Sequence, residues 1–186
     1  NVEVALRAVL LTEFLYAPQN RASLIKSPLE LIVGTLRQFR FETGEVLPVL
    51  MVARQLGQDM FAPPNVKGWP GGEAWINSAT LLQRKQLLER LFRAQEMRPT
   101  LDAMTREATD NAQAAGKAGG EGRQRLLRAM MDIHFDGDKW LSRFRPGDAQ
   151  LAKVVLAADP VNAPPADVQG VELLRQLVLD PVYQLK

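Results

Sequence analysis

The chain has 186 residues, of which 46% are hydrophobic and 24% charged, a composition typical of a folded globular protein and too apolar for a disordered one. Lys and Arg number 23 against 21 for Asp and Glu, so the net charge of +2 gives no indication of a strongly charged partner. Cysteine is absent and His134 is the only histidine. These counts exclude disulfides, thiol nucleophiles, Cys-ligated metal centres and any site that needs two histidines of this chain.

Apolar residues recur at helical spacing along the chain, and no run of alternating or β-branched residues predicts a strand. We therefore predict an all-α fold, an irregular bundle of about seven or eight helices. The first helix is expected over residues 2–16 and ends before Pro18. One apolar face of this helix is made by Leu6, Val9, Leu10 and Phe14.

The next helix begins after Ser27, because Ser27-Pro28-Leu29-Glu30 combines an N-cap serine, a proline at the first helical position and a glutamate at the third. A further helix is expected over residues 45–56, which Gly57 ends. The segment that follows, residues 58–72, reads QDMFAPPNVKGWPGG, and its prolines and glycines exclude regular structure. We call it the Pro/Gly/Trp loop. Its apolar residues predict an ordered loop packed on the core; they are Met60, Phe61, Val66 and Trp69.

A long helix is expected to begin near Glu73 or Ser78 and to continue to about Glu96. The remaining helices are predicted over residues 100–115, 123–134, 148–158 and 167–179, with a turn at residues 136–138 between the second and the third. Residues 114–122, AAGKAGGEG, are typical of a flexible Ala/Gly loop. We therefore divide the chain into a helical core over residues 1–113, this loop, and C-terminal helices over residues 123–186 that pack on the same core.

Basic residues are concentrated over residues 84–98, but two glutamates lie among them. The basic set comprises Arg84, Lys85, Arg90, Arg93 and Arg98, and the acidic set Glu89 and Glu96. Mixed charge at helical spacing favours a solvated helix face over a phosphate-binding surface, and we expect no nucleic acid as a partner. The richest apolar stretch, residues 2–17, is interrupted by charges, so no membrane span is expected.

Three carboxylates surround the only histidine, at Asp132, Asp136 and Asp138. Oxygen ligands around a glycine turn are typical of calcium sites, but this spacing does not fit an EF-hand loop, and no glutamate closes it. Aspartates that form hydrogen bonds in a turn are the favoured interpretation, and the metal site is a weak alternative. No serine lies in a Gly-x-Ser-x-Gly motif, and no catalytic residue or cofactor is predicted.

The strongest candidate for a binding surface lies in and after the Pro/Gly/Trp loop. Its glycines permit tight turns, and Trp69 and Trp75 are expected to fill the core. A second interpretation is a pocket for a sugar or a peptide, because aromatic faces beside amides suit such ligands. A third is an anion site at the start of the following helix. The candidate ligand-binding residues are Asn65, Lys67, Trp69, Glu73, Trp75 and Asn77.

Three segments resemble the C-terminal part of a bacterial family, domain of unknown function 1800. They are KSPLELIVGTLR from Lys26, LGQDMFAPPNVKGWPGGEAWIN from Leu56, and the ending LDPVYQLK from Leu179. Members of that family are longer, and the chain starts with Asn1 rather than Met, so we expect a fragment. The resemblance implies a largely helical protein that is often exported, hence periplasmic or secreted. It also implies a gene beside a sulfatase-like or phosphatase-like partner, and it identifies no catalytic residue.

Two functions are therefore considered. The first is a non-catalytic helical module that binds a partner protein or an envelope glycan through the surface around residues 65–77. The second is part of a hydrolase-like enzyme whose catalytic groups lie mainly N-terminal to this chain. In that case Asn65, Lys67, Trp69 and Glu73 contribute to a shared cleft.

Overall fold

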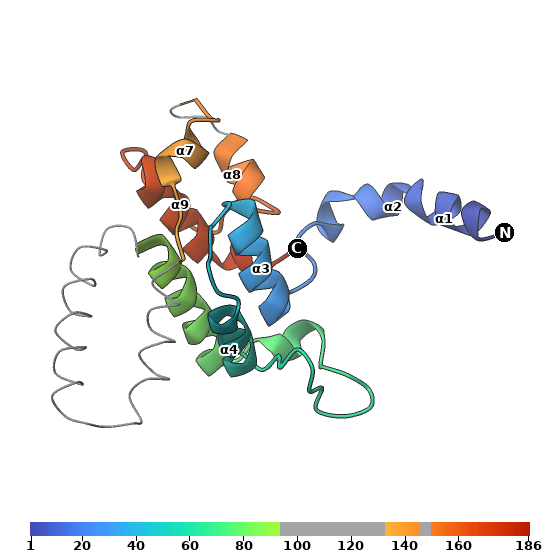
Figure 1. Cartoon of the computed structure of the whole chain (residues 1–186). Coiled ribbons are helices and arrows are strands. Elements are labelled where there is room, and N and C mark those ends of the chain that lie inside the picture. The colour runs from blue at the N-terminus through green and yellow to red at the C-terminus, as the bar shows by residue number, and fades with distance from the viewer. Residues whose placement is uncertain (94–132, 146–149) are drawn as a thin grey trace, which may run out of the picture.

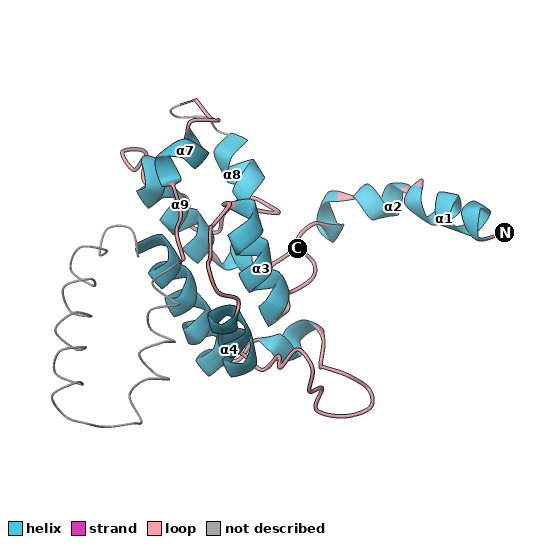
Figure 2. Ribbon diagram, in the orientation of Figure 1, coloured by secondary structure: helices cyan, strands magenta, loops and turns pink. Residues whose placement is uncertain are grey.

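The structure, a computed structural model, describes residues 1–93, 133–145 and 150–186 (Figure 1). Within these residues the regular elements are helices (Figure 2). Backbone pairing of β type is limited there to two isolated antiparallel bridges, Ile25 with Leu185 and Glu42 with His134. The all-α prediction is confirmed. The predicted loop over 114–122, the predicted helix over 100–115 and most of the predicted helix over 123–134 lie outside the described residues.

The N-terminal helices project away from the body of the molecule as an arm (Figure 1). In place of one helix over residues 2–16 there are two, α1 (Val2–Leu10) and α2 (Glu13–Tyr16), followed by the 3-10 turn η1 (Pro18–Asn20). The break lies at Thr12, whose hydroxyl donates to the Val9 carbonyl oxygen at 2.7 Å and so favours a turn over helix continuation. None of the residues in these three elements is buried. The predicted apolar face is therefore not buried within the described chain.

Helix α3 (Pro28–Gln38) begins where the sequence predicts. The Ser27 hydroxyl accepts from the Glu30 amide at 3.3 Å, and the Glu30 carboxylate accepts from the Ser27 amide at 2.8 Å, which completes the capping box. Helix α4 (Leu47–Gln55) confirms the predicted helix over 45–56 with slightly shorter ends. It packs on α3 through a small apolar cluster made by Ile32, Val49, Ala53 and Leu56.

The 3-10 turn η2 (Gly72–Trp75) follows the Pro/Gly/Trp loop, and a helix then covers residues 78–93 and ends the first described range. Asn77 and Thr80 cap this helix reciprocally, each side-chain oxygen accepting from the amide of the other at 2.9 Å. The residues buried on this helix are Arg84, Leu88, Leu91 and Phe92. Their spacing of four, three and one places them on one helix face, so the prediction that Arg84 lies on a solvated face is wrong.

The C-terminal part comprises α7 (Gly137–Leu141), α8 (Gln150–Val155), α9 (Gly170–Leu179) and the 3-10 turn η3 (Pro181–Gln184). The last two predicted helices are confirmed, but α7 stands where a turn was predicted. Asp136 caps α7 by accepting from the Lys139 amide at 2.9 Å, and Gly137 permits close packing, because a Cβ there would collide with Val171. The predicted helical end at His134 is wrong, since this residue pairs with Glu42 through its backbone at 2.7 Å.

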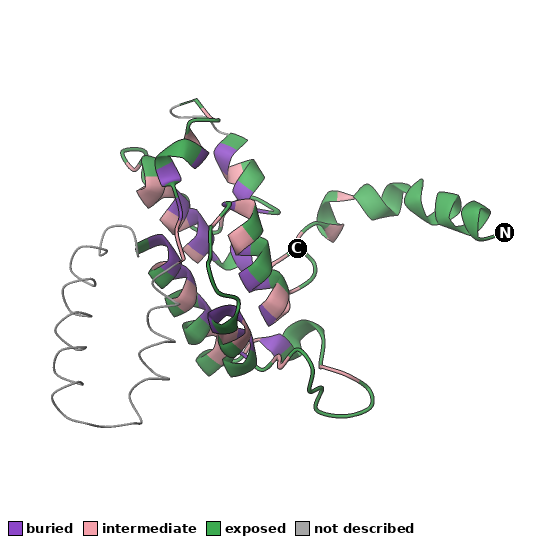
Figure 3. Ribbon diagram, viewed as in Figure 1, coloured by how far each residue is buried: buried purple, intermediate pink, exposed green. Residues whose placement is uncertain are grey.

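One main core joins α3, the helix over 78–93, α7, α8, α9 and η3 (Figure 3). At its centre Phe39 contacts four aromatic rings edge-on or tilted, with centroid distances from 4.9 to 6.5 Å. These rings belong to Phe41, Phe92, Phe135 and Trp140. Because they come from both sides of residues 94–132, the main core joins the two parts of the chain.

Candidate functional site

The Pro/Gly/Trp loop extends from the body beside α4 and η2 and is mostly exposed (Figure 3). The Phe61 side chain is 84% exposed and Val66 is fully exposed, while Trp69 is half-buried. The prediction of a packed loop is therefore wrong for its apolar residues. Prolines and glycines leave the loop few regular hydrogen bonds. Neither of the two described core clusters includes a residue of the loop.

Local contacts nevertheless define the loop's shape. The Asn65 side-chain oxygen accepts from the Lys67 amide at 2.8 Å, which forms an Asx turn, and the Gly68 amide donates to the Asn65 carbonyl oxygen at 3.0 Å. Gly68 adopts a positive φ of 88° that a side chain would strain. At the loop's start, the Gln58 side-chain oxygen accepts from the Leu29 amide at 2.9 Å and attaches the loop to α3.

The structure separates the roles of the six predicted binding residues. Trp75, at the end of η2, is 7% exposed and therefore buried, as one interpretation predicts. Asn77 is a helix cap, and Asn65 uses its side-chain oxygen within the loop. Asn65, Lys67, Glu73 and Asn77 are exposed and Trp69 is half-buried, so Trp75 is the one member of this set that is buried.

A polar cluster lies where the C-terminal segment meets α3 and the helix over 78–93. Arg84 is 0% exposed, and its Nη1 donates to the Lys26 carbonyl oxygen at 2.9 Å and to the Gln184 side-chain oxygen at 3.2 Å. The Nε and Nη2 atoms of Arg84 have no hydrogen-bond partner within the described chain. The sequence analysis assigned Arg84 to a solvated helix face, although its spacing to Leu88 and Leu91 is the signal that could have placed it in the core.

Lys26 and Tyr183 form the other half of this cluster. The Lys26 ammonium donates to the Tyr183 carbonyl oxygen at 2.8 Å and lies 4.1 Å from the centroid of the Tyr183 ring. The Tyr183 hydroxyl and the Thr35 hydroxyl share a hydrogen bond of 2.8 Å. Burial lowers the pKa of Lys26 to about 8, against a smaller opposite effect of Glu30. Burial also raises the pKa of Tyr183 to about 12.

Residues 1–185 match the family model described as "Protein of unknown function (DUF1800)". The chain belongs to this DUF1800 family. Comparisons with curated proteins and with solved structures gave no match. The resemblance found in the sequence is thereby confirmed over essentially the whole chain, and it now extends across residues 94–132 as well.

Two further features of this DUF1800 chain bear on its chemistry. Within the described ranges, no helix is long and apolar enough to cross a bilayer. No group of three potential metal ligands gathers among those same residues, and Asp132, one of the three predicted ligands, lies outside them. Of the other two, Asp136 is the N-cap of α7 and accepts from the Lys139 amide, and Asp138 lies in the first turn of that helix.

The polar cluster of the DUF1800 chain predicts an unusual dependence of stability on pH. As the pH rises from about 8 toward 10.5, the unfolded chain still holds the Lys26 proton that the folded chain has released. The free energy of unfolding therefore rises over this range. Above pH 10 it falls, because the unfolded chain releases the Tyr183 proton that the folded chain keeps to about 12.

Urea unfolding across the alkaline range measures this dependence. Lys26→Met is expected to abolish the rise, and Tyr183→Phe to abolish the fall, each relative to the parent chain. If Lys26→Met retains the full rise, the Lys26 ammonium is not the group responsible.

Proposed function

We propose that this chain is a non-catalytic binding and assembly module that contacts a partner protein through the Pro/Gly/Trp loop. The observation that carries this proposal is the exposure of Phe61 and Val66 on a loop whose backbone is held by the Asn65 turn and the Gln58 contact. Large exposed apolar side chains on an ordered loop are typical of protein interfaces, where they enter apolar pockets of the partner.

The same geometry favours a protein over an envelope glycan as the partner. A sugar site needs exposed aromatic faces beside free amides. Here Trp75 is buried, and the side-chain oxygens of Asn65 and Asn77 accept from backbone amides. The exposed residues of this region include Phe61 and Val66 together with the polar Asn65, Lys67, Glu73 and Asn77. A pocket that is apolar at its base and charged at its rim would complement this loop.

The N-terminal arm also exposes apolar side chains within the described chain. Its exposed apolar side chains include Val2, Leu6, Val9, Leu10, Leu11, Phe14, Leu15 and Tyr16. The two surfaces belong to different parts of the molecule, the arm and the loop (Figure 1).

The partner that we propose is a sulfatase-like or phosphatase-like protein, the class of gene neighbour that the family resemblance implies. The chain and this protein are mixed after purification, and their affinity is measured by biolayer interferometry. We expect the double variant Phe61→Ala/Val66→Ala to weaken binding by about tenfold or more, because both side chains leave the pocket. Val161→Ala is the matched control, since Val161 is 69% exposed on a different loop.

Unchanged affinity of the double variant contradicts this docking surface. The rival enzyme hypothesis makes a different prediction for the full-length protein. It requires turnover of phosphate, sulfate or glycosidic esters that Lys67→Ala or Glu73→Ala abolishes, while Phe61→Ala leaves it intact.

A further inference from the structure

Lys26 is a half-buried lysine whose ammonium group has only neutral partners within the described chain. Its Nζ donates to the Tyr183 carbonyl oxygen at 2.8 Å and lies 4.1 Å from the centroid of the Tyr183 ring. None of the ion pairs of the described residues includes Lys26. The other lysines among these residues are exposed; they are Lys67, Lys85, Lys139, Lys153 and Lys186. Lys26 is thus the lysine of this set that is partly withdrawn from water without a carboxylate in contact.

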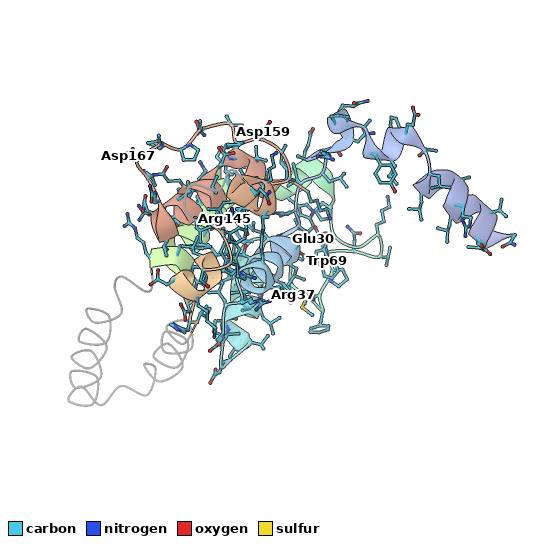
Figure 4. All side chains as sticks on the ribbon, turned by 90° about the horizontal axis from the view of Figure 1, so that it is seen from above. Glu30, Arg37, Trp69, Arg145, Asp159 and Asp167 are labelled. Atoms are coloured by element: carbon cyan, nitrogen blue, oxygen red, sulfur yellow. The ribbon has the colours of Figure 1, made fainter. Side chains whose placement is uncertain are left out.

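The charged groups that surround Lys26 are mostly positive. Glu30, on α3 (Figure 4), is bound by the Lys186 ammonium. Arg84, from the helix over 78–93, donates to the Lys26 carbonyl oxygen at 2.9 Å and makes no ion pair within the described residues. A guanidinium keeps its proton in proteins, whereas a buried lysine ammonium readily releases its own. Lys26 is therefore the cation of this cluster that is suited to lose its charge.

The electrostatics of the cluster support this assignment. Burial lowers the pKa of Lys26 to about 8, against a smaller opposite effect of Glu30. At a pH of about 7.5, about one quarter of the Lys26 amine is then neutral, against roughly one part in a thousand for a lysine of ordinary pKa. The hydrogen bond to Tyr183 uses an N–H of the neutral amine and leaves its lone pair free. Such a lone pair is what attacks a carbonyl carbon.

We propose that Lys26 is a nucleophilic lysine and the preferred site of covalent acylation of this chain by acyl phosphates. The neutral amine adds to the acyl carbon, phosphate leaves with the electron pair of the broken C–O bond, and the nitrogen releases a proton to water. The excess of positive charge in the cluster favours an electrophile that carries a phosphate. The proposal is independent of the docking function, because Lys26 does not belong to the Pro/Gly/Trp loop.

Acetyl phosphate added to the whole 186-residue chain tests this site. Peptide mapping by mass spectrometry follows the acetylation of each lysine separately. At a pH of about 7.5 we expect Lys26 to be acetylated at least about tenfold faster than Lys85 and Lys153, which are exposed controls within the same chain. The difference in neutral amine is larger than this, but the lower basicity and the partial burial of the Lys26 amine offset part of it.

The dependence of the rate on pH gives a second readout. The rate at Lys26 should level off above a pH of about 9, where its amine is almost fully neutral, whereas an ordinary exposed lysine gains neutral amine to a pH above about 10. In concentrated urea the rate at Lys26 should fall to that of Lys85 and Lys153, because unfolding removes the burial that favours the neutral amine.

Glu30→Gln keeps a residue that suits the capping box of α3 and removes the carboxylate that favours the Lys26 ammonium. We expect the rate at Lys26 to rise by about twofold at a pH of about 7.5, because more of the amine is neutral. Glu45→Gln, at an exposed position before α4, removes the same charge and should leave the rate unchanged. Thermal unfolding of both variants establishes that they are folded.

The proposal is overturned if Lys26 in the folded chain is acetylated no faster than Lys85 and Lys153. It is overturned equally if the rate at Lys26 continues to rise with pH as theirs does, because its amine is then an ordinary one. An unchanged or lower rate in the folded Glu30→Gln variant would also contradict it, since the charge of the amine then does not determine the rate.

Discussion

We expect Phe39→Ala to lower the free energy of unfolding by about 3–5 kcal/mol, the range typical of a large aromatic side chain removed from a core. Phe39 is 1% exposed, and its ring centroid lies 4.9 Å from that of Phe92 and 5.0 Å from that of Trp140. These partners belong to the two parts of the chain on either side of residues 94–132. The resulting cavity therefore weakens the contact that joins those parts.

Phe61→Ala is the matched control, because it removes the same atoms from a side chain that is 84% exposed. Its effect on stability should stay within about 0.5 kcal/mol. Urea denaturation followed by circular dichroism measures both variants. A loss of similar size for the two would mean that Phe61 packs in solution and that the loop is not free to dock. A small effect of Phe39→Ala would contradict the aromatic centre of the core.

Asp180→Ala should cost about 2–4 kcal/mol, because one buried carboxylate serves several donors. Its Oδ1 accepts from the Val182 amide at 2.9 Å and from the Val161 amide at 3.3 Å, and its Oδ2 accepts from the Asn162 amide at 2.8 Å. Removing the carboxylate leaves these amides without an acceptor at a position that is 3% exposed. The segment that follows α8 and the turn η3 are both hydrogen-bonded to this carboxylate, so its removal breaks the connection between them.

Asp180→Asn retains one carbonyl oxygen, so an intermediate loss is expected. Asp159→Ala, at an exposed position of the preceding loop (Figure 4), removes the same charge and should change stability little. Guanidinium denaturation distinguishes the three variants. Equal stability of the Asp180→Ala and Asp159→Ala variants would show that the carboxylate network contributes nothing measurable.

The elements that sequence analysis placed well are those with local signals. Helix α3 begins at its capping box, α4 ends before Gly57, and the Pro/Gly/Trp loop is irregular because its prolines lack amide donors. Such signals act within a helical turn and need no distant partner. The short α7 escaped notice because an Asp-Gly-Asp sequence suits a turn as well as a cap, and the burial of Trp140 decides between the two.

The candidate site was predictable only in part. Six residues were chosen by type and proximity along the chain, and the structure separates them into caps, core and surface. Phe61 and Val66 were expected inside because they are apolar, but the structure leaves both side chains exposed. Arg84 was expected outside because it is charged. Its hydrogen bond to Gln184 spans 100 residues, which no local pattern could reveal.

The amino-acid sequence by itself determined the family, the helical class and the ends of the best-capped helices, because periodicity, capping groups and prolines act on the nearest turns of backbone. Only the tertiary structure decided which apolar faces are covered. Burial depends on what lies opposite a side chain, and the residues opposite Phe39 or Arg84 come from segments distant in sequence. For the same reason, the exposure of the Phe61 and Val66 side chains and the burial of Arg84 became visible only in three dimensions.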